Sequence, residues 1–448
     1  MRKLKSFKIF TCLCLVLTFS ILISIGILTK FRNDANALFT NMDTEEQTIN
    51  IYTLVENTDP FETSDDLTFI IQTTIDQENQ NLALDEIKSK FNKELNIIKK
   101  VELLDAVDAL YEKEGKFLVL NAAYANTLDD LSAYQDFTSK TKIVYSFSRS
   151  ISQQQTYNHQ DITNTPFTIY VAGDDTRGSQ LTTFGRTDVN LLLNVNPNTK
   201  QILIVGIPRD AYIPNPALNY EDDKLTHLGN EGIQNTMNGI SEYFNIDINY
   251  YGKVIFDSFE KIIDAIGGID VDNPYYFDTI DGNGKLDGGV DHQFPEGLIH
   301  LDGESALAYC RERYNLSNGD YGRNEHQTYV LKAVVKKVLS KDILTNYASI
   351  LSALEGQFMT NLTTDEVLKL VSMQLTSLND WEIINYHLGG TGDMCGTASM
   401  GWNRQLYVVH LFDSQVQFIH DQIEKLKNDE ILVQDILPQN DETTYIPN

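Results

Sequence analysis

Arginines gather in a few short segments of this chain, and the densest of these is 308–327. It holds Arg311, Arg313 and Arg323. The chain as a whole is acidic, with 35 Lys and Arg against 63 Asp and Glu and a formal net charge of −28. Guanidinium groups concentrated in one segment of such a chain indicate a binding site for an anion. The alternative is a solvated cluster of salt bridges.

The spacing within this segment predicts how its side chains point. Arg311 and Arg313 are two residues apart, so in an extended backbone they point to the same side. Arg323 and Gln327 are four residues apart at the start of an apolar-periodic run, so on a helix they share one face. The N-terminus of such a helix itself favours an anion.

A second group of charged residues lies between two apolar strand candidates. Asp175 and Asp188 stand near the end of one strand and the start of the next, with Arg177 and Arg186 in the same loop. Carboxylates in these places can converge on one divalent cation, and oxygen ligands favour Mg²⁺ or Mn²⁺ over Zn²⁺. The arginines would hold the anion that the metal also touches. The alternative is an Asx-rich turn with local salt bridges.

A third candidate is Arg209, which directly follows the strand candidate 201–207. Pro208 ends that strand, because proline cannot donate to the ladder. Open α/β sheets bind ligands at the carboxyl ends of strands; a surface turn is the alternative. Arginines beside an aspartate-bound metal are typical of phosphoryl transfer, in which positioning and charge neutralisation do most of the work. His227 and His326 are weaker acid/base candidates, since lone histidines are more often structural.

The elements that position these residues alternate between strands and helices. The strand candidates are near-continuously apolar, which suits a sheet covered on both faces. Asn196–Thr199 is a turn sequence, so the strands on either side of it are expected to form a hairpin. We therefore expect an α/β fold with a mixed central sheet flanked by helix layers. Its strands are 167–171, 189–195, 201–207 and 250–256, followed late in the chain by 381–388 and 406–409, and its helices are 232–244, 258–266, 328–340, 343–354, 364–376 and 413–427.

The N-terminus predicts a membrane anchor. Residues 1–8 carry four basic side chains, and residues 9–29 form a run without a charge that is long enough to span a bilayer as a helix. The basic flank should stay in the cytoplasm, which places the rest of the chain outside a cell membrane crossed once. A cleaved signal peptide ending near Ala35–Ala37 is the alternative.

Composition divides the rest of the chain and excludes some functions. We expect a polar stalk, a small α+β accessory domain, a linker, a main domain with its core at 167–341, and a tail. The acidic balance argues against nucleic acid as a partner. Four cysteines without a C-x-x-C pair give no zinc signature, and Cys310 and Cys395 are either a disulfide or two free thiols. The expected bounds are 30–50 for the stalk, 51–150 for the accessory domain, 151–166 for the linker, 167–430 for the main domain and 431–448 for the tail.

Several motifs, in the right order, resemble the LytR-CpsA-Psr family of Gram-positive envelope proteins. The resemblance covers about 165–341 and continues more weakly to about 427. The accessory domain looks like that of the streptococcal capsule members. The motifs are Asp175-Thr-Arg177, Arg186-Thr-Asp188, Ile207-Pro-Arg-Asp210, Asp264-Ala-Ile-Gly-Gly268, Gly297-Leu-Ile-His-Leu-Asp-Gly303, Ala306-Leu-Ala-Tyr-Cys-Arg-Glu-Arg313 and Gly319-Asp-Tyr-Gly-Arg323.

The resemblance implies a phosphotransferase. Such proteins move a glycopolymer, here capsular polysaccharide or a teichoic-acid-like polymer, from polyprenyl pyrophosphate onto peptidoglycan. The prenyl chain lies in an apolar tunnel between sheet and helices, and the pyrophosphate sits at its mouth with Mg²⁺. Asp175 and Asp188 match the acidic metal-binding pair; with Arg209 they are the expected catalytic residues, Asp175 being our first choice as general base. The matching pyrophosphate-binding set is Arg186, Arg209, Arg311, Arg313, Arg323 and Gln327.

Two positions depart from the family pattern. His326 stands where the family often has arginine before the glutamine, and Thr226 replaces an asparagine after Lys224. Two other functions stay open: a lipid pyrophosphatase, with water in place of the sugar, and a non-catalytic protein that binds polyprenyl phosphate or regulates capsule synthesis. The polymer, the acceptor hydroxyl and the oligomeric state cannot be inferred from the sequence.

Overall fold

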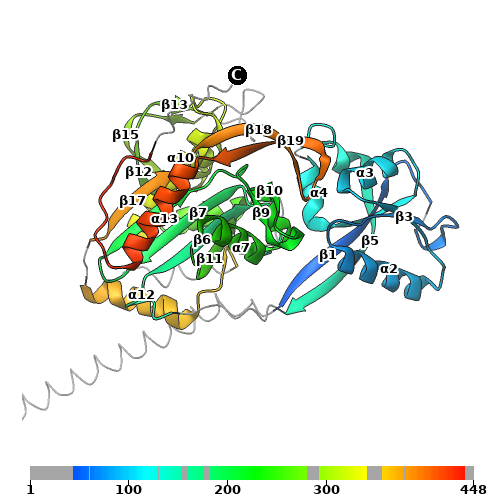
Figure 1. The fold of residues 1–448 in the computed structure, drawn as a ribbon, viewed down its shortest axis with the longest axis horizontal. Helices are drawn as coiled ribbons and strands as arrows, with labels where there is room; N and C mark the ends of the chain where they lie inside the picture. The colour runs from blue at the N-terminus through cyan, green and yellow to red at the C-terminus, as the bar shows by residue number, and fades with distance from the viewer. Residues whose placement is uncertain are drawn as a thin grey trace, which may run out of the picture.

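A computed structural model describes residues 44–59, 61–129, 131–152, 160–174, 182–279, 292–340, 356–377 and 380–438. Figure 1 shows two α/β bodies: a larger one built around a central sheet, and a smaller one formed by the N-terminal part of the described chain. The expected anchor 9–29 and the expected helix 343–354 lie outside these residues. Within them, no helix is both long enough and apolar enough to cross a membrane.

The larger body contains a six-stranded mixed sheet, as the sequence predicts. The order is β16-β11-β6-β7-β8-β17; β6 is parallel to β11, β8 is parallel to β17, and the remaining pairs are antiparallel. The expected hairpin is β7–β8. The strands are β6 (Phe167–Asp174), β7 (Val189–Asn196), β8 (Gln201–Gly206), β11 (Tyr250–Ile255), β16 (Met359–Thr360) and β17 (Glu382–His387).

Helices cover both faces of this sheet because alternate side chains on its strands are apolar on both sides. On one face, Tyr170 and Leu192 share a core with α7 (Ile233–Phe244) and α13 (Asp413–Lys427). On the other, Ile169 and Leu193 pack towards Leu331 of α10 and Leu370 of α12. The helices on this second face are α8 (Phe256–Ala265), α9 (Gly303–Arg311), α10 (Asp320–Val338) and α12 (Thr364–Ser377).

Short hairpins and turns complete the larger body. The β9–β10 and β12–β15 pairs are antiparallel, and β13 pairs with β14. The elements are β9 (Tyr212–Asn215), β10 (Glu221–Lys224), α6 (Leu225–Leu228), β12 (Ile269–Asn273), β13 (Phe277–Asp278), β14 (Gln293–Phe294) and β15 (Gly297–Leu301), with 3-10 turns at Pro216–Leu218 and Gly229–Glu231.

The backbone that leads into Arg311 is helical, whereas an extended backbone would be needed for Arg311 and Arg313 to point to the same side. The Asp302 carboxylate accepts a hydrogen bond from the backbone N–H of Ser305 and caps α9. The helix then continues to Arg311, so Arg311 lies in its last turn and Arg313 follows in the loop. The predicted helix with Arg323 and Gln327 on one face is present as α10, but it begins eight residues earlier than expected.

The smaller body has a five-stranded sheet in the order β3-β2-β4-β1-β5. Its first strand begins at Thr44, so 44–50 belong to the sheet and not to the expected stalk; pairing with β5 orders these polar residues. Its elements are β1 (Thr44–Leu54), β2 (Thr68–Gln72), β3 (Asn96–Lys100), β4 (Phe117–Asn121), β5 (Thr141–Ser152), α2 (Gln77–Phe91), α3 (Leu103–Tyr111), α4 (Ala122–Asp129), α5 (Phe137–Lys140) and a 3-10 turn at Phe61–Thr63.

A long hairpin, β18 (Gly390–Thr397) and β19 (Gly401–Leu411), joins the two bodies (Figure 1). At its tip the backbone N–H of Trp402 donates to the Glu102 carboxylate over 3.0 Å, and Met400 is buried in the apolar core of the smaller body. β18 was missed in the sequence because it is rich in glycine. Leu432, expected in the tail, is buried against the central sheet, so the main domain extends past residue 430.

Candidate phosphate and lipid site

The candidate site lies where β6 ends, β7 begins and β8 ends, at one edge of the central sheet. Asp188 stands just before β7, and its backbone N–H donates to the carbonyl of Gly173 over 2.8 Å. Arg209 follows β8, and its Nη1 donates to Asp188 Oδ1 over 2.7 Å. Thr226 Oγ1 donates to the same carboxylate oxygen over 3.4 Å. The two predicted segments therefore meet as expected.

Charge holds the Asp188 carboxylate in its ionised form. Burial acts against ionisation, but the positive charges of Arg209, Arg186 and Arg323 outweigh it and hold the pKa of Asp188 well below its usual range. Burial acts to lower the pKa of Arg209, but the charges of Asp188 and Asp210 outweigh it and hold the pKa above its ordinary value, so this guanidinium is charged. The structure thus brings together three of the predicted arginines around one carboxylate.

The remaining predicted residues lie at the ends of α9 and α10. Arg323 forms an ion pair with Asp320 in the first turn of α10. Arg311 lies over the ring of Phe256, 5.3 Å from its centroid, and Arg313 Nη2 donates to the hydroxyl of Tyr314 over 2.7 Å. Burial lowers the pKa of Arg323, and the charges of Arg209 and Arg313 lower it as well.

The last residues of the predicted set are Gln327 and Asp175, the second carboxylate of the expected acidic pair. Gln327 is buried, and its amide donates to the carbonyl of Cys310 over 3.4 Å. Asp175 and Arg177 lie outside the described residues. Asp188 is therefore the predicted metal ligand that the structure describes, and an ionised carboxylate is the oxygen donor that a hard divalent cation prefers.

Two buried ion pairs near this edge were not singled out in the sequence. Lys253 Nζ lies 3.0 Å from Asp174 Oδ2, with both side chains almost fully buried. Lys224 Nζ lies 2.7 Å from Asp210 Oδ1. Burial raises the pKa of Asp210, but Lys224 and Arg209 lower it below its ordinary value. A lysine inside the apolar strand sequence 250–255 is the signal that reveals Lys253.

An apolar cavity of about 160 Å³ lies between β6, β7 and β11 on one side and α8, α9 and α10 on the other. Phe256 lines it and carries Arg311 on its ring, while Cys310 and Gln327 line it beside the arginines. The apolar space thus adjoins the charged edge. Its other lining residues are Val171, Ala172, Gly173, Val189, Leu191, Val254, Phe259, Ile262, Ile263, Leu307, Val330, Leu331 and Val334.

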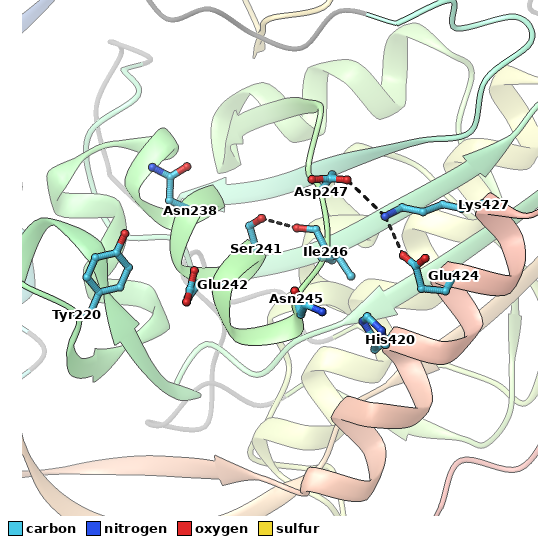
Figure 2. A pocket seen from close by; sticks show the side chains of 10 residues that line it. All are labelled: Tyr220, Asn238, Ser241, Glu242, Asn245, Ile246, Asp247, His420, Glu424 and Lys427. Atoms are coloured by element: carbon cyan, nitrogen blue, oxygen red, sulfur yellow. Dashed lines mark hydrogen bonds and ion pairs between the residues drawn. The ribbon is translucent and has the colours of Figure 1, made fainter.

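A larger hollow of about 680 Å³ lies on the opposite face, between α7 and α13 (Figure 2). Its walls carry the carboxylates of Glu242, Asp247 and Glu424, and Lys427 Nζ lies 2.9 Å from Glu424 and 3.6 Å from Asp247. This excess of negative charge would repel a phosphate. The smaller apolar cavity is therefore the better candidate for a phosphate-bearing lipid.

Both histidines considered as acid/base groups are buried. His227 Nδ1 lies 3.0 Å from Asp223 Oδ1. His326 stacks on Tyr309 at 4.3 Å between ring centroids, and its Nε2 lies 3.1 Å from the hydroxyl of Tyr275. Burial lowers the pKa of His326 to about 4, so it packs as a neutral ring.

The two cysteines of the described residues are free thiols. Cys310 is buried in the cavity wall, where burial raises its pKa to about 12, and Cys395 lies on β18. The disulfide alternative for Cys310 and Cys395 is therefore wrong.

Known proteins are similar to this chain in sequence and in fold. Residues 131–410 match the LytR_cpsA_psr family. An Enterococcus faecalis protein named polyisoprenyl-teichoic acid–peptidoglycan teichoic acid transferase TagU is 34% identical over 57% of this chain and 78% of its own length. The Bacillus cereus protein of that name is 36% identical over 45% of this chain and 62% of its own length. A Streptococcus agalactiae structure shares the fold, with a TM-score of 0.51 and 24% identity over 63% of this chain and 94% of that one.

The burial of His326 predicts an acid-sensitive fold. The unfolded imidazole takes up a proton near pH 6.5, whereas the folded one does so only near pH 4. The unfolded state therefore binds more protons between these values, and stability falls as the pH drops through this window. In His326→Gln this contribution disappears, so the difference in unfolding free energy between the two proteins should change by about 3 kcal/mol across it.

Urea unfolding at a series of pH values from 7 to 4 measures this difference. Tyr275→Phe is the control, since it removes the hydroxyl beside His326 but keeps the buried imidazole. It should be less stable at every pH and retain the wild-type slope. A His326→Gln protein with the wild-type slope would contradict the prediction.

Proposed function

The chain belongs to the LytR-CpsA-Psr family, and from this premise we propose that it is a phosphotransferase of the cell envelope. It would transfer a glycopolymer from polyprenyl pyrophosphate to peptidoglycan. Relatives of this chain are named teichoic acid transferases, and we extend that activity to a teichoic-acid-like polymer or a capsular polysaccharide. The anchor at 9–29 would hold the enzyme in the cell membrane, with residues 1–8 in the cytoplasm and the folded part outside.

One observation carries this proposal: a cluster of buried and half-buried arginines adjoins an apolar cavity. Arg186, Arg209 and Arg323 act on one carboxylate, and Arg311 lies on Phe256 in the cavity wall. A polyprenyl pyrophosphate has the two matching parts, an apolar chain and a polyanionic head. The chain would enter the cavity and the head would replace water among the guanidinium groups.

The reaction then follows from the charges. A hydroxyl oxygen of a wall sugar attacks the phosphorus that bears the polymer, and the bond from that phosphorus to the oxygen of polyprenyl phosphate breaks. Arg209, Arg311 and Arg313 would hold nonbridging oxygens and stabilise the charge that develops on the leaving phosphate. Arg186, Arg323 and Gln327 would complete the head-group site.

The hydroxyl proton must pass to a base, and Asp188 is poorly suited to accept it. Its pKa lies well below the ordinary value, which makes it a weak base at neutral pH. Its role is therefore electrostatic. Asp175, from the same loop, stays our first choice for the base, with Asp188 and Arg209 as the other catalytic residues.

We propose that a divalent cation binds at the same place. Mg²⁺, or Mn²⁺ as the alternative, would be held by Asp188 together with Asp175, and when bound it would neutralise pyrophosphate charge. Arg209 and Thr226 donate side-chain hydrogen bonds to Oδ1 of the Asp188 carboxylate.

Two other functions differ in what happens to the lipid. In a lipid pyrophosphatase, water would attack in place of the sugar. In a regulatory protein, the same cavity would bind polyprenyl phosphate without turnover. A single assay separates them: full-length protein in detergent is given a saccharide linked to polyprenyl pyrophosphate, with and without wall glycan, and released polyprenyl phosphate is measured. Release that needs the glycan supports transfer; release without it favours the hydrolase, and binding without release favours the regulator.

Replacing Arg209 tests the anion site. Arg209→Ala should lower kcat by about 10²–10³-fold, because a preorganised donor to the developing charge is lost. Arg149→Ala is the matched control; this arginine pairs with Glu78 on the smaller body and should retain wild-type turnover. Equal activity in Arg209→Ala and Arg149→Ala would show that the anion site lies elsewhere.

Removing the metal tests the cation. Chelation followed by dialysis should abolish transfer, and added Mg²⁺ should restore it. Asp188→Asn should need a higher Mg²⁺ concentration for half-maximal activity, since a neutral amide is a weaker ligand for a hard cation than a carboxylate. Activity that survives chelation unchanged would rule out the metal.

Filling the cavity tests the lipid. Val330 of α10 is buried in the cavity wall, whereas Val338 on the same helix is 47% exposed. Val330→Trp should raise KM for a long-chain substrate by about tenfold or more and spare a short-chain analogue that needs only the head-group site. Val338→Trp should match the wild type with both substrates. Equal loss with long and short chains would argue against this cavity.

A further inference from the structure

Three side chains with metal-binding atoms project from one face of the β18–β19 hairpin. Asp393 and Cys395 are two residues apart on β18 and so point to the same side. His410 on β19 pairs with Thr391, which has the same parity, so its imidazole joins them. A carboxylate, a thiol and an imidazole thus meet without a local sequence motif, which is why the sequence did not reveal them.

Their spacing resembles the coordination shell of a tetrahedral ion. Cys395 Sγ lies 3.6 Å from Asp393 Oδ2 and 3.8 Å from His410 Nε2, and these last two atoms are 3.6 Å apart. Zinc bonds of about 2.3 Å to sulfur and about 2.0–2.1 Å to nitrogen or oxygen place tetrahedral ligands about 3.3–3.6 Å from one another. Shifts of a few tenths of an ångström would close the site.

We propose that this hairpin binds one zinc ion through Asp393, Cys395 and His410, with water at the fourth position. The Cys395 thiol would lose its proton to solvent as the sulfur–metal bond forms. A thiolate and an imidazole select a borderline transition metal over Mg²⁺ or Ca²⁺. The site is thus chemically distinct from the proposed magnesium site at Asp188, and it does not depend on the proposed function.

The surroundings of these three residues favour a cation. The Asp393 carboxylate lies 3.6 Å from both Cys395 Sγ and His410 Nε2, which puts a negative charge at the site. The ring of Tyr212 packs edge-on against His410, 5.3 Å between centroids, and its hydroxyl donates to the carbonyl of Gly396 over 2.8 Å. Contacts of this kind orient a ligand before the metal arrives.

The position of the site gives it a mechanical role. At one end of the hairpin the carbonyl of Gly390 accepts a hydrogen bond from Tyr321 of α10, and at the other Trp402 and Arg404 contact Glu102 and Asp108 of the smaller body. A metal held by both strands would cross-link this connection between the two bodies. Asp393 and His410 are 61% and 46% exposed, so the ion can exchange with solvent.

Cobalt is the probe, because thiolate-bound Co²⁺ has an intense charge-transfer band and four-coordinate Co²⁺ has visible d–d bands. The protein is the metal-free full-length chain with Cys12→Ser and Cys14→Ser. These substitutions leave Cys310 and Cys395 as the two thiols of the chain. Titration with Co²⁺ should produce both bands with one ion per chain, and Zn²⁺ should abolish them. Zn²⁺ should also slow alkylation of Cys395 by a maleimide.

Matched variants identify the ligands. Cys395→Ser should lose the charge-transfer band and weaken Zn²⁺ binding by at least about 100-fold, since even outer-shell changes cost about 10–100-fold. Cys310→Ser, which removes the buried thiol, should keep both. His410→Gln should lose affinity, whereas His300→Gln should not, although His300 forms a comparable exposed pair with Asp270 on the β12–β15 hairpin.

The proposal fails under three results. One is Co²⁺ binding without a charge-transfer band, and another is a band that persists in Cys395→Ser. The third is an equal loss of Zn²⁺ affinity in His410→Gln and His300→Gln. Circular dichroism of each variant shows whether a loss reflects unfolding, and the maleimide rate measured with the His410→Gln protein tests the site with the thiol still in place.

Discussion

Positive charge at the edge of the central sheet is balanced by carboxylates, and Asp188 is the one on which Arg186, Arg209 and Arg323 all act. The charge of Arg209 acts against that of Arg323, and burying such a charge without a partner would cost several kcal/mol. The Asp188 carboxylate, held by Arg209 at 2.7 Å, compensates for part of this charge. Asp320, which pairs with Arg323, compensates for a further part.

The same sheet serves two different purposes on its two faces. Against α7 and α13 its side chains pack into a continuous core around Tyr170 and Leu192. Against α8, α9 and α10 the packing leaves an apolar space beside the arginines. A void of this kind forfeits dispersion energy, which a long apolar ligand would restore. The strand sequences give no sign of this difference, because both faces are equally apolar.

The sequence revealed the elements that repeat a strong pattern and the charged residues that follow them. The apolar strands, the β7–β8 hairpin and the meeting of Asp188 with Arg209 were all predictable, since strand ends and turn residues are local signals. The start of α10, the course of β1 and the β18 strand were not, because these segments are polar or rich in glycine; β1 and β18 are ordered by pairing with β5 and β19. The geometry of Asp393, Cys395 and His410 likewise depends on the register between two strands.

The buried pair of Lys253 and Asp174 has a consequence for how the sheet assembles. Lys253 lies on β11 between Gly252 and Val254, whose side of the strand faces the apolar cavity. If β11 slipped by one residue along β6, the ammonium group would turn into that cavity and lose its carboxylate. The cost of an unpaired buried charge, about 3–5 kcal/mol, would far exceed the loss of a single backbone hydrogen bond. The pair therefore favours the observed register of β6 and β11 over registers shifted by one residue.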